Sequence, residues 1–130
     1  MKKELQDKLF KKYPKIFRRR TFLIGRFYMR WGIECGDGWY NLINKLCKKI
    51  QEYCNKDNTF QAKAIRVKEQ FRGLRFYIDG GDDYIYDLIN NAENESYKIC
   101  EDCGAPINIT VNRAGRISTL CTVCRKSNKI

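Results

Sequence analysis

Apolar residues recur at helical spacing in three stretches of this 130-residue chain, and each stretch predicts an amphipathic helix. The first helix is expected over residues 2–13, where Pro14 ends it. The second is expected from about residue 39 to 53. The third begins at Asp82 or Asp83, either of which can cap it, and runs to about residue 97.

Between the second and third helices, β-favouring residues predict two strands over 62–68 and 74–78, joined as a hairpin by a short connection around residues 71–73. The aromatic-rich stretch 22–31 predicts a further extended segment. Residues 32–39 predict a loop, with a turn at Asp37-Gly38. The expected fold class is therefore α+β, with helices packed on a small antiparallel sheet.

Four cysteines in two pairs close the chain, and their spacing is that of a zinc ribbon. A tight turn within each pair directs two thiolates at one ion, Gly104 allows the backbone to turn back, and residues 107–120 predict a hairpin between the pairs. Four protein ligands leave no open position, so one structural Zn²⁺ is expected. The predicted ligands are Cys100, Cys103, Cys121 and Cys124. The predicted domains are an α+β body over 1–99 with a basic N-terminal region, and a zinc ribbon over 100–130 docked on it.

Disulfides and a thioredoxin-like redox motif are the alternatives to zinc. The chain opens without an apolar leader segment, which favours the cytoplasm, where stable disulfides are rare. A redox pair expects a strand-to-helix setting, whereas here two pairs flank a predicted hairpin. Iron remains the competing metal, because rubredoxin-like sites also use four thiolates. The sequence contains no apolar run long enough to span a membrane.

Charge is unevenly distributed along the chain, whose formal net charge is +11. Basic side chains dominate residues 1–30 and alternate with aromatic residues in 15–31, a composition suited to phosphate contact and base stacking. The simpler interpretation is a solvated basic surface over an aromatic core. The candidate contacts to nucleic acid or to a partner are Lys15, Arg18, Arg19, Arg20, Arg26 and Arg30.

Acidic side chains gather instead in residues 79–95. They allow three interpretations, namely helix capping, a negative face for a basic partner, and a Mg²⁺ site of a two-metal nuclease. The candidates for an acidic partner face are Asp79, Asp82, Asp83 and Asp87.

The chain contains no histidine, which excludes Ser-His-Asp and Cys-His catalysis and histidine-ligated catalytic zinc. Cys35 lies among carboxylates, which raise the pKa of a thiol, and it is therefore a poor nucleophile. Cys47 and Cys54 lie on or beside a predicted helix and are expected to be buried. Trp39 is expected to anchor the core behind an ordered turn. A non-enzymatic protein is the prediction.

Three blocks of sequence, residues 31–39, 67–77 and the two cysteine pairs with their flanking residues, resemble a family of small phage and prophage proteins. The resemblance covers roughly residues 28–125 and implies a phage setting and a zinc ribbon, but no catalytic residues. Small phage proteins often counter host defence. The resemblance therefore implies an anti-CRISPR-like inhibitor in the cytoplasm of a bacterial host, which blocks an RNA-guided nuclease by binding its protein surface.

The net charge of +11 constrains this expectation, because such a protein cannot imitate nucleic acid over its whole surface. It would dock on an acidic or mixed face of a host defence effector, or present only residues 79–95 to a basic channel. The alternative is a zinc-ribbon regulatory protein that binds nucleic acid through residues 15–31 and the ribbon.

Overall fold

The computed structural model describes residues 1–18, 28–57, 60–111 and 117–127 of the chain. The protein is α+β, as the sequence predicts. In chain order its elements are α1 (Lys3–Lys12), β1 (Ile33–Glu34), a short 3-10 helix η1 (Asp37–Trp39), α2 (Tyr40–Asp57), β2 (Lys63–Gln70), β3 (Gly73–Asp79), α3 (Asp83–Ser96), β4 (Ile109–Val111), β5 (Thr119–Cys121) and α4 (Thr122–Ser127).

The larger sheet has the order β1-β2-β3 and is mixed. β2 and β3 form the expected antiparallel hairpin, whereas β1 pairs parallel to β2, with Ile33 opposite Val67. The prediction of a purely antiparallel sheet and of a loop throughout 32–39 was therefore wrong. A two-residue strand is too short to leave a period in the sequence.

The edge of β2 also bonds to segments outside the sheet. The amide of Ala64 donates to the carbonyl of Ile16 at 2.8 Å, and the amide of Met29 donates to the carbonyl of Ile65 at 2.7 Å. Residues 28–31 form a turn, not the extended segment predicted for 22–31, because Met29 and Gly32 both have positive φ. Residues 22–27 lie outside the described residues.

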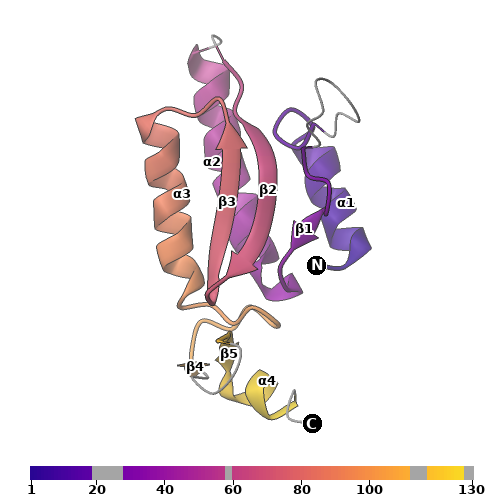
Figure 1. Cartoon of the computed structure of the whole chain (residues 1–130), viewed down its shortest axis with the longest axis vertical. Helices are drawn as coiled ribbons and strands as arrows, with labels where there is room; N and C mark the ends of the chain where they lie inside the picture. Colours follow the sequence, from indigo (N-terminus) through magenta and orange to yellow (C-terminus); the bar gives the residue numbers. More distant parts are fainter. Residues whose placement is uncertain (19–27, 58–59, 112–116, 128–130) are drawn as a thin grey trace.

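Helices α2 and α3 cover one face of the larger sheet, and its other face is open (Figure 1). The core lies between the helices and the sheet. Trp39, Ile43 and Ile50 are fully buried opposite Val67 and Leu74. Burial of such large apolar side chains is the main stabilising term of the body.

Two local predictions about the ends of elements are confirmed. Asp82 caps α3 by accepting a hydrogen bond from the amide of Ile85 at 3.1 Å. The β2–β3 connection is a two-residue turn in which Phe71 and Arg72 have φ of 52° and 64°. Positive φ at both positions is the conformation of a type I′ hairpin turn, which ordinarily takes Asn or Gly.

Among the helices that the structure describes, none combines the length and the apolar character needed to cross a membrane.

Candidate functional site

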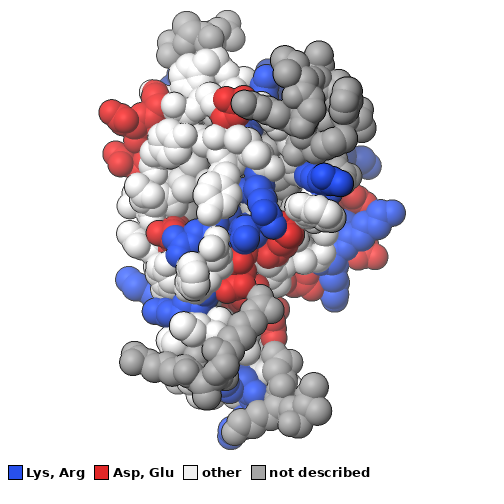
Figure 2. Space-filling view, in the orientation of Figure 1, with Lys and Arg blue, Asp and Glu red and all other residues white. Residues whose placement is uncertain are grey.

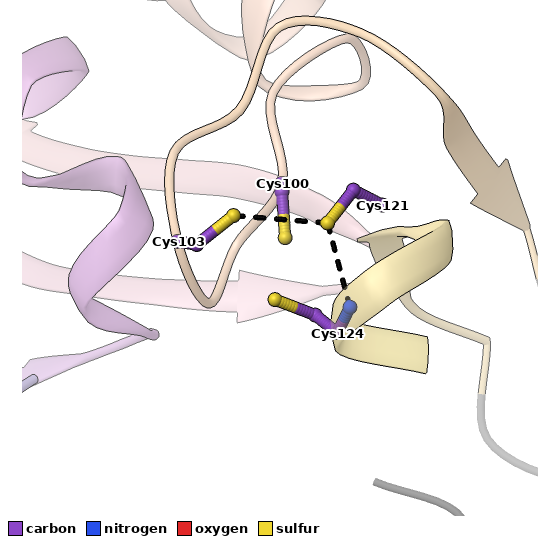
Figure 3. A group of neighbouring side chains, drawn as sticks. All are labelled: Cys100, Cys103, Cys121 and Cys124. Carbon is purple, nitrogen blue, oxygen red and sulfur yellow. Dashed lines mark hydrogen bonds between the residues drawn. The ribbon is translucent and has the colours of Figure 1, made fainter. Parts of the chain in front are cut away.

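The four cysteine thiols converge (Figure 3) in a small module that lies below the body (Figure 1). Cys100 and Cys103 lie on the loop after α3, Cys121 ends β5 and Cys124 lies in α4. All four sulfur atoms are within 4.8 Å of one another, and the Sγ atoms of Cys103 and Cys121 are 3.7 Å apart. The structure thus brings together the four predicted ligands in one cluster that can hold a metal ion.

The first cysteine pair sits on the tight turn that its spacing predicts. The amide of Gly104 donates to the carbonyl of Cys100 at 2.9 Å, and the amide of Cys100 donates to the carbonyl of Ala105 at 2.9 Å. Gly104 has φ of 82°, a conformation that side chains rarely adopt, which confirms its expected role.

The second pair differs from the prediction, because a short helix and not a second tight turn follows Cys121. The first turn of α4 carries Cys124 back towards Cys121, and its amide donates to the Cys121 sulfur at 3.5 Å. This hydrogen bond lowers the pKa of the Cys121 thiol to about 7. The thiolate is the form that binds metals.

The loop before α2 holds the first cysteine pair against the body. The amide of Gly38 donates to the carbonyl of Glu101 at 2.7 Å, and the amide of Gly36 donates to the Glu101 carboxylate at 2.9 Å. The buried indole of Trp39 donates to the carbonyl of Ile99 at 2.9 Å. A side chain at Gly38 would collide with the backbone of this pair, so the close approach requires glycine.

The tip of the β2–β3 hairpin makes a second attachment to the cysteine module. Thr119 donates its hydroxyl to the carbonyl of Arg72 at 2.7 Å, and the Arg72 guanidinium lies 4.7 Å from the centre of the Tyr97 ring. Residues 31–39, residues 67–77 and the two cysteine pairs are far apart in the sequence, and they therefore meet at one junction in the fold. Sequence analysis interpreted residues 34–39 only as a turn that starts a helix and missed this contact.

Two of the six predicted basic contacts lie together. Lys15 and Arg18 line a hollow of about 460 Å³ that also includes Lys63. Lys63 was not predicted, because a lysine in a strand carries no motif. Arg30 lies elsewhere, 5.0 Å from the centre of the exposed Trp31 ring. Arg19, Arg20 and Arg26 lie outside the described residues.

The predicted acidic residues are divided among different roles. Asp79 accepts a hydrogen bond from the Tyr28 hydroxyl at 2.5 Å, and Asp82 caps α3 and also accepts one from the Tyr53 hydroxyl. Asp83 and Asp87 are exposed on α3. Within the described ranges, the four cysteines are the one group of His, Cys, Asp or Glu side chains close enough to hold a metal ion.

The remaining cysteines are buried, as expected for Cys47 and Cys54. The pKa of Cys35 rises to about 12, in the predicted direction. The main cause is burial and the next is Glu101, which packs in from the cysteine module, while Asp37, one of the adjacent carboxylates that the sequence suggested, raises this pKa less. Burial also raises the pKa of Cys47, so the Cys35 and Cys47 thiols are protonated and unreactive at neutral pH.

Comparison of the chain with protein-family models, with curated proteins and with solved structures finds no match. The function is therefore argued from the site and the surface of this chain.

Proposed function

We propose that this chain is a non-enzymatic, zinc-stabilised protein that binds nucleic acid through the surface of α1, α2 and the segment after α1. The observation that carries the proposal is the gathering of exposed lysine and arginine side chains on these elements. Such side chains contact phosphates and do not require a pocket for a particular nucleobase. These basic side chains are Lys3, Lys8, Lys11, Lys12, Lys15, Arg18, Lys45, Lys48, Lys49 and Lys56.

The open face of the sheet is a weaker candidate for this role, because its arginines are paired. Arg66 donates to Glu34 at 2.8 Å, and Arg75 forms an ion pair with Glu93. Figure 2 shows basic and acidic side chains side by side at the middle of this face. Paired charges attract a polyanion less than α2 does, because its four lysines outnumber Glu52 and Asp57.

Zinc fits the spacing of the cysteine cluster. Zn–S bonds of about 2.3 Å in a tetrahedron place the sulfur atoms about 3.8 Å apart. The Cys103–Cys121 separation of 3.7 Å has this value, and the remaining pairs lie within 4.8 Å. Zinc would hold four thiolates in a closed set and so stabilise the module without supplying a reactive water. Metal analysis separates zinc from iron, since an iron–thiolate site is coloured and a zinc site is not.

The test of nucleic-acid binding is the salt dependence of affinity for a labelled single strand and for a duplex. We expect the logarithm of the binding constant to fall linearly with the logarithm of salt concentration. A Lys8→Gln, Lys11→Gln, Lys48→Gln variant should reduce the slope by about 0.7–0.9 for each phosphate contact removed. The matched control is Asp83→Asn with Asp87→Asn, on α3 and outside the proposed surface. An absence of binding at 50 mM salt, or a slope unchanged in the lysine variant, would contradict the proposal.

A second candidate function is the anti-CRISPR-like inhibitor of a host defence nucleoprotein, acting on a protein surface. The observation that favours it is the exposed first half of α3, where Asp83 and Asp87 accompany Tyr84 and Tyr86, which are about half exposed. Acidic and tyrosine side chains together suit a basic protein surface. Inhibition of target cleavage by an RNA-guided nuclease, lost in an Asp83→Lys, Asp87→Lys variant, is the expected result. Full activity of every nuclease tested would contradict it.

A further inference from the structure

A hollow of about 460 Å³ lies where three segments of the body meet. In Figure 1 the segment after α1, the C-terminal end of α2 and the start of β2 come together at the end of the body away from the cysteine module. The hollow is lined by Pro14, Lys15, Arg18, Cys54, Asn55, Phe60, Gln61 and Lys63. Its volume is in the range of small-molecule binding sites, about 300–1,000 Å³.

The segment that carries Lys15 and Arg18 is fixed on both sides. The amides of Ile16 and Phe17 donate to the carbonyl of Tyr13 at 3.2 and 3.0 Å, which forms a turn behind Pro14. The carbonyl of Ile16 accepts the amide of Ala64, the residue after Lys63. Both Ile16 and Phe17 are buried. The backbone therefore places Lys15 and Arg18 beside Lys63 irrespective of any ligand.

Among the lining residues that the structure describes, three are cations and none is a carboxylate, an arrangement that folding alone does not favour. Like charges held in one small space repel one another and lower the stability of the folded state. An anion in the hollow would remove that repulsion and gain charge-assisted hydrogen bonds.

The polar side chains of the hollow are held in position by their neighbours. Gln51 donates to the side-chain oxygens of Asn55 and Gln61, each at 2.9 Å, and the amide nitrogen of Gln61 donates back to Gln51 at 3.1 Å. Because the Asn55 side-chain oxygen accepts the hydrogen bond from Gln51, the side-chain N–H groups of Asn55 are the donors that can face a ligand. Phe60, held edge-on against Tyr53 at 6.2 Å between ring centres, adds an aromatic wall.

We propose that this hollow binds the phosphate of a nucleotide, with Lys15, Arg18 and Lys63 holding the phosphate and Phe60 lying against the base. The ligand class is a nucleoside monophosphate, either free or as the phosphorylated end of a strand. For a strand end, the inference deepens the nucleic-acid binding proposed above and rests on it. For a free nucleotide it stands independently.

The test is calorimetric titration of the full-length metallated protein with adenosine 5′-monophosphate, adenosine and inorganic phosphate at 150 mM salt. We expect the nucleotide to bind and adenosine not to bind. Arg18→Gln and Lys63→Gln should each weaken nucleotide binding about tenfold or more, the range for a lost hydrogen bond to a charged group. Lys98→Gln, an exposed lysine that follows α3 and lies outside the hollow, is the matched control and should change binding less than about twofold.

No binding of the nucleotide at millimolar concentration would overturn the inference, as would equal losses in Arg18→Gln, Lys63→Gln and Lys98→Gln. Inorganic phosphate that binds as tightly as the nucleotide would overturn the role of Phe60 and reduce the site to an anion site. Unchanged urea unfolding of the exposed Arg18→Gln variant separates lost binding from lost folding. Binding of the nucleotide without binding of a nucleic-acid strand or duplex would support this site and contradict the proposed function. Failure of the nucleotide site and failure of the proposed function are therefore distinguishable.

Discussion

A single indole links the body to the cysteine module at the residue scale. Trp39 is fully buried, and its N–H donates to the carbonyl of Ile99, the residue before the first cysteine ligand. Trp39→Phe keeps an aromatic ring but leaves that carbonyl without its donor. We expect the free energy of unfolding in urea to fall by about 2 kcal/mol, because an unsatisfied buried acceptor costs about 1–3 kcal/mol.

The control for this prediction is the other tryptophan of the chain, Trp31, whose side chain is 62% exposed. Trp31→Phe should change the free energy of unfolding by less than about 0.5 kcal/mol, as is usual for surface substitutions. Equal losses in the two variants would show that the Ile99 contact contributes nothing of its own.

Residue-level prediction from sequence succeeded where chemistry dictates spacing. The clustering of the four cysteines follows from two CxxC pairs, and the direction of the Cys35 pKa shift follows from the carboxylates of its segment, although its main cause is burial. Lys63 could not be predicted, since only folding brings β2 beside the segment after α1. The same is true of Glu101, which reaches Gly36 across 65 positions of sequence.

Backbone strain at the β2–β3 turn is a feature of one element. Phe71 has φ of 52° and a 70% exposed side chain, so the strain is not offset by burial of its ring. Phe71→Asn should raise the free energy of unfolding by about 1 kcal/mol, because asparagine tolerates the left-handed conformation at a type I′ turn. Chemical denaturation measures the change, and Phe71→Ala is the control, since it removes the ring without relieving the backbone. A gain in Phe71→Ala as large as that in Phe71→Asn would refute the strain argument.

The cap of α3 predicts a pH dependence at the same scale. The hydrogen bond from Tyr53, and then the amide of Ile85, lower the pKa of Asp82 below its ordinary value of 3.8. The folded state therefore binds this proton less tightly than the unfolded state does. The stabilisation by Asp82 is present above pH 3.8 and is lost as pH falls through the lower folded value.

Asp82→Asn keeps a capping oxygen but cannot ionise. Its stability should therefore fall less than that of the parent protein between pH 5 and pH 2, and the two unfolding curves should converge at the acid end. Parallel stability profiles over that range would contradict the assignment of the cap to the ionised carboxylate.

Elements with many residues were predictable from their period, and short ones were not. The apolar residues of α2 recur at helical spacing, and apolar and polar residues alternate along β2 and β3. Both patterns arise because one face of each element is buried, so they can be seen in the sequence. β1 has two residues and α4 has six, too few to repeat a pattern. Both are set by tertiary contacts, β1 by pairing with β2 and α4 by the need to return Cys124 to Cys121.

At the scale of the whole molecule, charge and architecture separate three regions. Acidic side chains gather over the N-terminal end of α3, and basic side chains with some acidic ones among them lie over α1 on the other side of the same view (Figure 2). The cysteine module lies at a third position, below the hairpin tip (Figure 1). A partner that binds one of the two charged regions leaves the other free, so nucleic-acid binding and protein binding are not mutually exclusive on this scaffold.

Removal of the proposed zinc ion tests how independent the cysteine module is of the body. The module buries only a small cluster around Cys100, Leu120 and Cys121, whereas α2, α3 and the larger sheet share a far larger core. A structural zinc site contributes about 10–16 kcal/mol of binding free energy, more than so small a cluster can supply. A chelator should therefore release one zinc ion per chain and unfold the module, while most of the helical circular dichroism of α2 and α3 persists.

Trp39 reports on the junction in this experiment. In a Trp31→Phe background it is the one tryptophan of the chain, and its emission should shift to longer wavelength as the bond to Ile99 is lost. Cys103→Ser, which removes an exposed ligand without disturbing the core of the body, should reproduce the shift without chelator. If the emission spectrum does not change when the chelator is added, the module is held by its contacts with Gly36, Gly38 and Arg72 alone. Complete loss of helical signal would show instead that body and module fold as one unit around the metal.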